Sequence, residues 1–273
     1  MKHKRLTPAF TMLELIFVIA ILGVVASLGS EMIVKIYDSY IVQRAQHRAT
    51  LKTQLAATQI ANRLASAIPG TVYRIRTNNN YEPIDSDIPG GISGDDYKGI
   101  QWVGADTESF SATATPGWSG FCDIDGSSTP TISTPGSNLN STANVISNLA
   151  GGTFPSFNSA VYFPYDITAY PVTTPAGNTL TFTGTIPTHI VEHYKLAWTS
   201  YALIVDGGDL YLYYNFDPTA MAARDETTRS LLMKNISTFK FKGAGRTIRF
   251  KICKQERISA DLNITSCKEK AVF

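Results

Sequence analysis

The sequence is poor in cysteine, in net charge and in recognisable catalytic motifs. Its 273 residues include only three cysteines, and 24 Lys and Arg residues nearly balance 22 Asp and Glu residues, for a formal charge of +2. Overall charge therefore gives no argument for nucleic-acid binding, which only a local basic patch could support. The sequence contains no Ser/His/Asp nucleophile elbow, no phosphate-binding glycine loop and no paired Cys-x-x-Cys motif. We therefore expect neither an enzyme nor a resident cofactor.

No acidic residue precedes Glu14, and the segment around it is long and apolar. A basic stretch at residues 2–5 comes before it, and an uncharged run of 16 residues, 15–30, follows it. As a helix, residues 10–30 would be about 31 Å long, which just spans the hydrocarbon core of a bilayer. The sequence therefore predicts one transmembrane helix over residues 10–30.

Glu14 is the anomaly in this segment. A carboxylate inside such a run costs up to about 2.5–3.5 kcal/mol on insertion scales, and less near the interface, so it needs a partner. Cleavage after Ala9 would give Phe10 a cationic α-amino group close to Glu14 in the sequence. In a packed bundle the amine of a neighbouring subunit could reach Glu14 equally well. We therefore expect Glu14 to act in subunit assembly.

The segment Phe-Thr-Met-Leu-Glu that begins at Phe10 resembles the class III signal segment of type IV pilins and type II secretion pseudopilins. Phe10, Glu14 and Gly23 fall on the family's first mature residue, its acidic residue and its helix glycine. The resemblance implies that a prepilin peptidase removes residues 1–9 on the cytoplasmic side, between Ala9 and Phe10. It also implies N-methylation of Phe10 and retention of the apolar segment in the inner membrane.

Two positions depart from the commonest family pattern. Gly usually precedes the cut, where this chain has Ala9, and major pilins often have a proline where it has Glu31. The second difference is typical of a minor subunit. Two other interpretations of the segment are an ordinary secretory signal cut near Ser27 or Gly29 and the plain membrane anchor of an unrelated protein.

The helix is expected to continue well beyond the membrane. No Pro or Gly occurs from Glu31 to Ile68, and Pro69-Gly70 then ends the segment. Residues 10–68 would form a helix of about 88 Å. The expected apolar stripe consists of Ile33, Ile36, Tyr37, Tyr40, Ile41, Leu51, Leu55, Ile60, Leu64 and Ile68.

Residues 69–273 are expected to form a head in the periplasm. Gly, Ser, Thr, Asn, Asp and Pro are frequent up to residue 160, which predicts a loop-rich insertion over about 78–160. This insertion is either a variable surface for partner contact or a solvated spacer. Short strands are expected at residues 71–76, 161–163 and 179–183.

Two hairpins and a short helix complete the expected head. Strands at 200–205 and 210–215 flank the turn signal Asp-Gly-Gly-Asp. A short helix is expected over 224–236. A second hairpin over 238–253 has its turn at 243–245. The fold class is therefore α+β, with a long N-terminal helix packed on an antiparallel sheet.

The C-terminal half carries a second resemblance. Tyr-Ala-Leu from Tyr201, Leu-Tyr-Leu-Tyr-Tyr from Leu210, and the segment from Leu231 to Phe241 are similar to strands of the J-type minor pseudopilins of type II secretion. The resemblance implies a structural minor subunit that initiates or caps a periplasmic pseudopilus. Its partners would be the prepilin peptidase, other major and minor pseudopilins and the inner-membrane assembly platform. The same patterns also fit a minor pilin of a DNA-uptake system.

The three cysteines suit a head exported to an oxidising space. Cys253 falls on the strand face opposite Phe250 and Ile252, where a C-terminal tail could reach it, so a Cys253–Cys267 disulfide is expected, with Cys122 free. In the chain-entropy model such a loop is worth about 3 kcal/mol. Between these cysteines, Asp-Leu-Asn-Ile-Thr fits an acidic extended sequon, which makes Asn263 a candidate for glycosylation.

Two motifs could hold a metal ion. His189-Ile-Val-Glu-His193 matches the H-x-x-E-H pattern of inverted zinc peptidases, which needs both histidines on one helical face. A membrane-anchored zinc peptidase is thus a remote alternative, although Pro187 and the residues after His193 are more typical of an extended segment.

The second motif is an acidic, glycine-rich stretch that could bind Ca²⁺ or simply form turns. Its members are Asp85, Asp87, Asp95, Asp96 and Asp106.

The second hairpin would place four basic residues, Lys240, Lys242, Arg249 and Lys251, on one face. Such a ribbon could neutralise about four phosphates. Lysines on an outer strand more commonly discourage aggregation. Removal of residues 1–9 would also change the formal charge from +2 to −1. Nucleic acid is therefore not an expected partner.

The first prediction concerns the mature N-terminus. We expect intact-mass analysis of membrane-extracted protein to show loss of residues 1–9 and one added methyl group on Phe10. A mature chain that begins near Leu28 or Gly29 would contradict the pilin interpretation.

Overall fold

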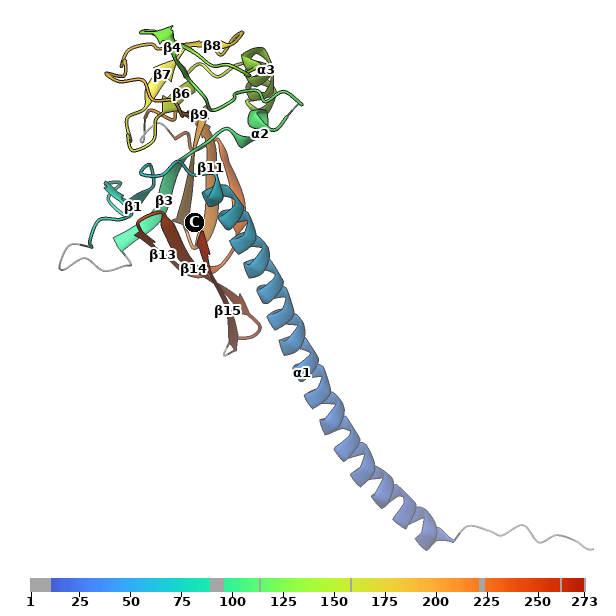
Figure 1. Cartoon of the computed structure of the whole chain (residues 1–273). Coiled ribbons are helices and arrows are strands. Elements are labelled where there is room, and N and C mark those ends of the chain that lie inside the picture. Colours follow the sequence, from blue (N-terminus) through green and yellow to red (C-terminus); the bar gives the residue numbers. More distant parts are fainter. Residues whose placement is uncertain are drawn as a thin grey trace, which may run out of the picture.

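The computed structural model describes residues 11–88, 96–112, 114–157, 159–220, 224–260 and 262–272. These residues form a long helix and a β-rich head, which confirms the α+β class (Figure 1). Helix α1, Met12–Ala65, ends before the predicted Ile68. The reason is that the chain already joins the head: Ala67 forms a β-bridge with Gly104, and the Ile68 N–H donates to the Val103 carbonyl at 2.9 Å.

The largest sheet is antiparallel and six-stranded, in the order β12-β11-β10-β3-β1-β2. Its strands are β1 Tyr73–Arg76, β2 Tyr81–Pro83, β3 Tyr97–Gly104, β10 Thr199–Asp206, β11 Asp209–Phe216 and β12 Arg229–Met233. The hairpin predicted around Asp-Gly-Gly-Asp is β10–β11, with Asp206 paired to Asp209. Gly207 and Gly208 have φ of 58° and 82°, as the favoured two-residue hairpin turn requires.

The C-terminal sheet is three-stranded, in the order β13-β14-β15. Its strands are β13 Ile236–Ala244, β14 Thr247–Arg257 and β15 Asn263–Val272. The second predicted hairpin is thus confirmed, with Phe241 opposite Phe250. The predicted turn at 243–245 is wrong by about two residues, because Ala244 pairs with Thr247 and leaves Gly245-Arg246 as the loop.

The predicted disulfide lies across this sheet. Cys253 and Cys267 are directly opposite on β14 and β15, with their Cα atoms 4.0 Å apart, and they are bonded. Cys122 is the free cysteine and is buried. The bond closes the β14–β15 hairpin, which runs alongside α1 (Figure 1).

Small side chains let the head approach α1 closely. The buried face of the helix carries Ala49, Thr53, Ala56 and Ala57 as well as Ile60 and Leu64. Strand β15 lies along this face, where the Lys270 ammonium donates to the Thr58 hydroxyl at 3.0 Å and the Ser266 hydroxyl to the Thr50 hydroxyl at 3.2 Å.

The expected apolar stripe is only partly confirmed. Ile60 and Leu64 are buried, whereas Leu51 and Leu55 are 47% and 63% exposed. The stripe predicted the helix but only part of its head-facing side, because Ala49, Ala56 and Ala57 are buried where Leu51 and Leu55 were expected.

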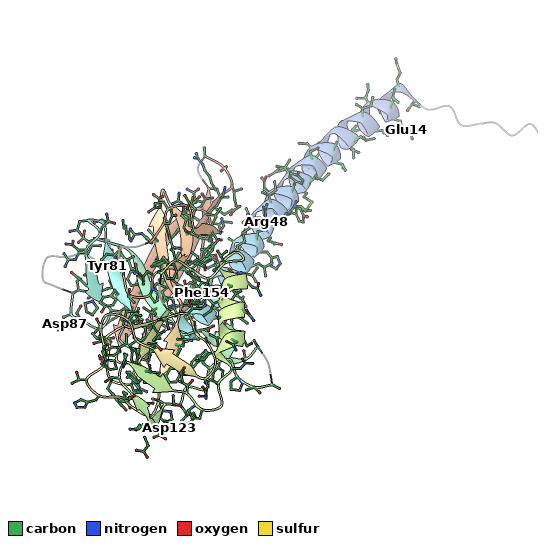
Figure 2. All side chains as sticks on the ribbon, turned by 90° about the horizontal axis from the view of Figure 1, so that it is seen from above. Glu14, Arg48, Tyr81, Asp87, Asp123 and Phe154 are labelled. Atoms are coloured by element: carbon green, nitrogen blue, oxygen red, sulfur yellow. A yellow bond between two sulfur atoms is a disulfide. The ribbon has the colours of Figure 1, made fainter. Side chains whose placement is uncertain are left out.

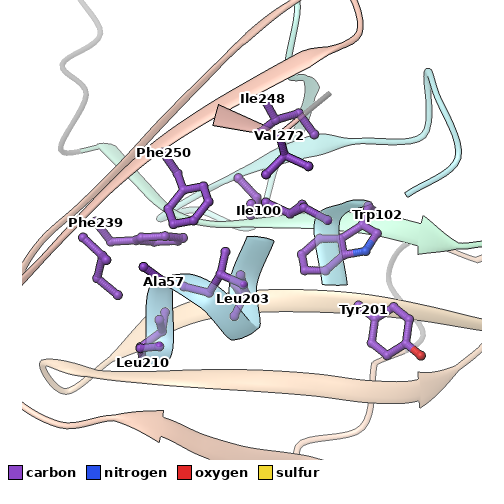
Figure 3. Packing of buried hydrophobic residues seen from close by; sticks show 14 of the residues in the cluster. Ala57, Ile100, Trp102, Tyr201, Leu203, Leu210, Phe239, Ile248, Phe250 and Val272 are labelled. Carbon is purple, nitrogen blue, oxygen red and sulfur yellow. The ribbon is translucent and has the colours of Figure 1, made fainter. Parts of the chain in front are cut away.

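The main core lies where α1 and the two sheets just described meet (Figure 3). Ala57 contributes from the helix, Ile100 and Leu203 from the six-stranded sheet, and Phe250 and Val272 from the C-terminal sheet. Each of these side chains is at most 8% exposed. Burial of one large apolar side chain contributes about 1.5–3 kcal/mol, so this core fixes the head on the second half of α1.

A second lobe is inserted between two neighbouring strands of the six-stranded sheet. The insertion leaves β3 after Gly104 and returns to β10 at Thr199, and these two residues are paired. We call residues 105–198 the distal lobe. It contains α2 Thr107–Phe110, β4 Asp123–Ser128, β5 Thr131–Ser133, α3 Leu139–Leu149, β6 Ser159–Tyr162, β7 Tyr170–Val172, β8 Thr179–Thr181 and β9 Lys195–Ala197.

The distal lobe has its own core and lies at the end of the head away from the helix start (Figure 1). Its strands form two three-stranded sheets, β4-β5-β8 and β7-β6-β9. Trp118, Ile132, Leu139 and Leu196 pack between them. Because the two ends of the insertion lie side by side in the six-stranded sheet, the insertion places little constraint on that sheet.

The structure corrects two further expectations. Residues 224–236, expected as a helix, contain strand β12 and the first residue of β13, because Leu210–Tyr213 of β11 pairs with residues 229–233. Tertiary pairing here overrides local helix propensity. The loop-rich insertion expected over 78–160 has other bounds: β3 is a central strand, α3 forms within the Ser/Thr-rich tract, and the inserted lobe runs over 105–198.

Candidate functional site

The first part of α1, up to Arg48, contains no buried residue. The first buried residue of the helix is Ala49, and Val42 and Ala45 before it are half-buried, so the start of α1 lies about 55 Å from the first residue that the head buries (Figure 2). Large apolar side chains from Met12 to Tyr40 are 44–87% exposed. An 18-residue window of this helix reaches a mean hydropathy of 2.5, long and apolar enough to cross a membrane. This uncovered segment, residues 12–48, is the main candidate functional surface.

Glu14 lies in the first turn of α1, at the end far from the head (Figure 2). Thr11 caps the helix, and its hydroxyl accepts a hydrogen bond from the Glu14 backbone N–H at 3.3 Å. Thr-x-x-Glu is the signature of a capping box, in which the Glu side chain can return a hydrogen bond to the cap. Sequence reasoning missed this second role, although the spacing itself indicates it. The carboxylate is exposed and forms no ion pair with any described residue.

The cleavage and methylation predictions stay untested, since Ala9 and Phe10 lie outside the described residues. The candidate glycosylation residue Asn263 is the exposed first residue of β15, opposite Arg257. An oligosaccharyltransferase could reach it there, but its modification also stays a prediction.

The two candidate metal motifs do not assemble. Residues 189–193 are not helical, so His189 and His193 do not share the helical face that the zinc-peptidase pattern needs. His193 instead forms a β-bridge with Phe121. Across the described ranges, no group of three or more His, Cys, Asp or Glu side chains is placed to hold a metal ion.

The acidic stretch is dispersed, and Asp95 lies outside the described residues. Asp106 is buried as the N-cap of α2, where it accepts hydrogen bonds from the Ser109 N–H at 3.1 Å and from the Ser109 hydroxyl. Burial raises the pKa of Asp106 to about 6. Asp106 is therefore a buried structural carboxyl, and Asp85 and Asp87 are loop residues without a shared ligand geometry.

A charged cluster that sequence reasoning missed joins β1, β2 and β3. The Tyr97 hydroxyl donates to Glu82 at 2.6 Å, and Arg76 contacts the same carboxylate. The buried Arg74 guanidinium lies 4.9 Å from the centre of the Tyr97 ring. The Tyr97 hydrogen bond and the two arginines lower the pKa of Glu82. These contacts tie three strands together, so we assign the cluster a structural role.

The predicted basic face is present but is not purely basic. Lys240 is opposite Lys251, and Lys242 is opposite Arg249. The third strand places Glu269 beside Lys251, and Arg249 forms an ion pair with Glu269 at 3.6 Å. The register places no aromatic side chain between these groups, although stacking on aromatics usually accompanies single-strand binding.

No family model, no curated protein and no solved structure matches the chain. The function is therefore inferred from the uncovered segment of α1 and from the head attached to the second half of this helix.

The second prediction tests the basic face. We expect replacement of Lys240, Lys242, Arg249 and Lys251 by Glu to leave DNA binding and DNA uptake within about twofold of wild type, since Glu269 already interrupts the patch. Filter binding across a salt series measures this, and thermal melting checks the fold. The opposite result has two parts: the wild type binds DNA with a log–log slope of affinity against salt concentration of about −3 to −4, and the variant selectively loses this binding. That result would support a DNA-uptake subunit.

Proposed function

We propose that this chain is a minor pilin-like subunit of a type II secretion pseudopilus or a related filament, with a structural role and no enzymatic activity. A prepilin peptidase would remove residues 1–9 and expose Phe10. The protein would then stand in the bacterial inner membrane as a single-pass subunit with its head in the periplasm. Other pseudopilins and the inner-membrane assembly platform would be its partners.

The uncovered segment of α1 is the observation that supports this proposal. Full burial of a single large apolar side chain is worth about 1.5–3 kcal/mol, and residues 12–48 expose many of them. Lipid would cover residues 12–30 before assembly. Helices of neighbouring subunits would cover a longer part of the segment in a filament, including Tyr37 and Tyr40, which lie beyond the span of a bilayer core.

The head favours a terminal position in the filament. The distal lobe, residues 105–198, enlarges the head at the end away from the start of α1 (Figure 1). A subunit at the tip has fewer lateral neighbours, so a large head is best accommodated there. The residues that resemble J-type minor pseudopilins lie in β10, β11, β12 and β13, which build the two sheets that hold α1.

The third prediction separates the two roles of Glu14. Glu14→Gln keeps a side chain that can complete the capping box but removes the charge, whereas Glu14→Val removes both. If Glu14 pairs with an ammonium group during docking, both variants should insert normally but co-assemble at least about tenfold less, as expected for a lost charge-assisted hydrogen bond. The measurement is the yield of the subunit in purified filaments relative to its amount in the membrane.

Glu31→Gln is the matched control, because Glu31 lies on the same helix but is already paired with Lys35 at 2.7 Å. It should assemble like wild type. Normal assembly of Glu14→Gln together with loss for Glu14→Val would show that capping, and not charge pairing, is the role of Glu14.

A further inference from the structure

A cleft of about 480 Å³ lies between the end of α1 and the distal lobe. Its buried surface is apolar and includes Ile68, Trp118 and Phe163. Its exposed surface includes two rings in contact, Phe121 and His193, whose centres are 4.6 Å apart and whose planes are inclined by 52°. The β-bridge between these two residues, together with the Tyr194 N–H bonded to the Gly120 carbonyl at 3.0 Å, holds this wall in place.

Tyr165 lines the same cleft in an unusual conformation. It is the third residue of a β-turn closed by the Asp166 N–H and the Phe163 carbonyl at 3.2 Å, and its φ is 65°. Gly or Asn is usual at such a position, because the left-handed backbone conformation costs free energy for a tyrosine. Its side chain is 98% exposed, so no contact within the described chain compensates for this cost.

Two cations complete the cleft. Lys195 comes from β9 and Arg246 from the β13–β14 turn, so they meet from different lobes. Neither forms an ion pair or a hydrogen bond with any described residue, although Asp85 lines an adjoining cleft with both of them. Desolvation lowers the pKa of Lys195, and the nearby Arg246 charge lowers it further. Two neighbouring cations that form no ion pair with a described carboxylate favour an anionic ligand.

The polar groups of the cleft distinguish between ligand classes. The Tyr162 hydroxyl is already bonded to the Pro218 carbonyl at 2.8 Å, and the Ser119 hydroxyl is bonded to Ser137 at 3.1 Å. A sugar displays hydroxyl groups around its whole ring, whereas the polar groups left open here are the two cations and the exposed side chains of Tyr165 and His193. An aromatic side chain next to a carboxylate matches the apolar walls and the two cations better.

We propose that this cleft binds an extended peptide segment in which aromatic and acidic residues alternate, with the rings against Phe121 and Tyr165 and a carboxylate between Lys195 and Arg246. The segment would belong to a partner protein. This site is independent of the uncovered segment of α1 and does not require filament assembly.

The test uses the full chain in nanodiscs and the fluorescent-labelled peptide acetyl-Gly-Phe-Asp-Phe-Asp-Gly-amide, read by fluorescence anisotropy with empty nanodiscs as the blank. We expect saturable binding. The peptide with Asn in place of Asp should bind at least about tenfold more weakly, because it loses charge-assisted hydrogen bonds. The peptide with Ala in place of Phe should lose binding as well.

Variants locate the site. Lys195→Gln combined with Arg246→Gln should weaken binding of the acidic peptide at least about tenfold. Tyr165→Asn, which keeps a residue that tolerates positive φ, should weaken binding of both the acidic and the Asn-containing peptide. Lys242→Gln combined with Lys251→Gln is the control, because it removes the same charge from the outer face of β13–β14 and should leave binding unchanged.

Three results would overturn the proposal. The first is no saturable binding of the acidic peptide at millimolar concentration. The second is equal binding of the acidic and the Asn-containing peptide. The third is binding of trigalacturonate, an acidic oligosaccharide, in preference to the peptide with the same dependence on Lys195 and Arg246, which would reassign the cleft to sugar acids.

Discussion

An apolar helical surface must be covered by something other than water, and this requirement governs the whole molecule. The head buries residues of α1 only from Ala49 onward, and the large apolar side chains between Met12 and Tyr40 stay exposed. The fold of this chain is therefore complete only in a second environment. A bilayer can cover the first part of the segment, and a bundle of similar helices can cover all of it.

The head is attached only to the second half of α1. Alanines and Thr53 bring β15 and the helix into close contact, and a core shared by α1 and two sheets fixes the second half of the helix. The Cys253–Cys267 disulfide closes the hairpin that lies along this face. The distal lobe, by contrast, has a separate core and joins the rest through paired ends at Gly104 and Thr199. The lobe also contacts α1 through an ion pair between Glu108 and Arg63 at 3.7 Å, and the cleft at its base combines residues from both parts.

The sequence predicted features that depend on local pattern. The helix from Met12, the Asp-Gly-Gly-Asp hairpin, the alternating strand around Phe250 and the disulfide all follow from short-range periodicity or spacing. Sequence reasoning failed where pairing between distant segments decides the local structure. Strand β12 was expected as a helix, β3 was hidden in a stretch rich in loop residues, and the alanine face of α1 gave no hydrophobic signal. The cleft at the base of the distal lobe could not be foreseen, because Tyr165, Lys195 and Arg246 are far apart in the sequence and only the fold brings them together.

The identity of what covers the uncovered segment in cells is the most direct test of this account. Ile19, 63% exposed in the apolar run, can be replaced by the photo-crosslinking residue p-benzoylphenylalanine and irradiated in the native host. The account predicts products whose cross-linked peptide maps to the apolar N-terminal helix of another subunit and which disappear when the assembly machinery is deleted. Cross-links to the head of this chain or to a water-soluble protein, or a pattern unchanged by that deletion, would contradict it.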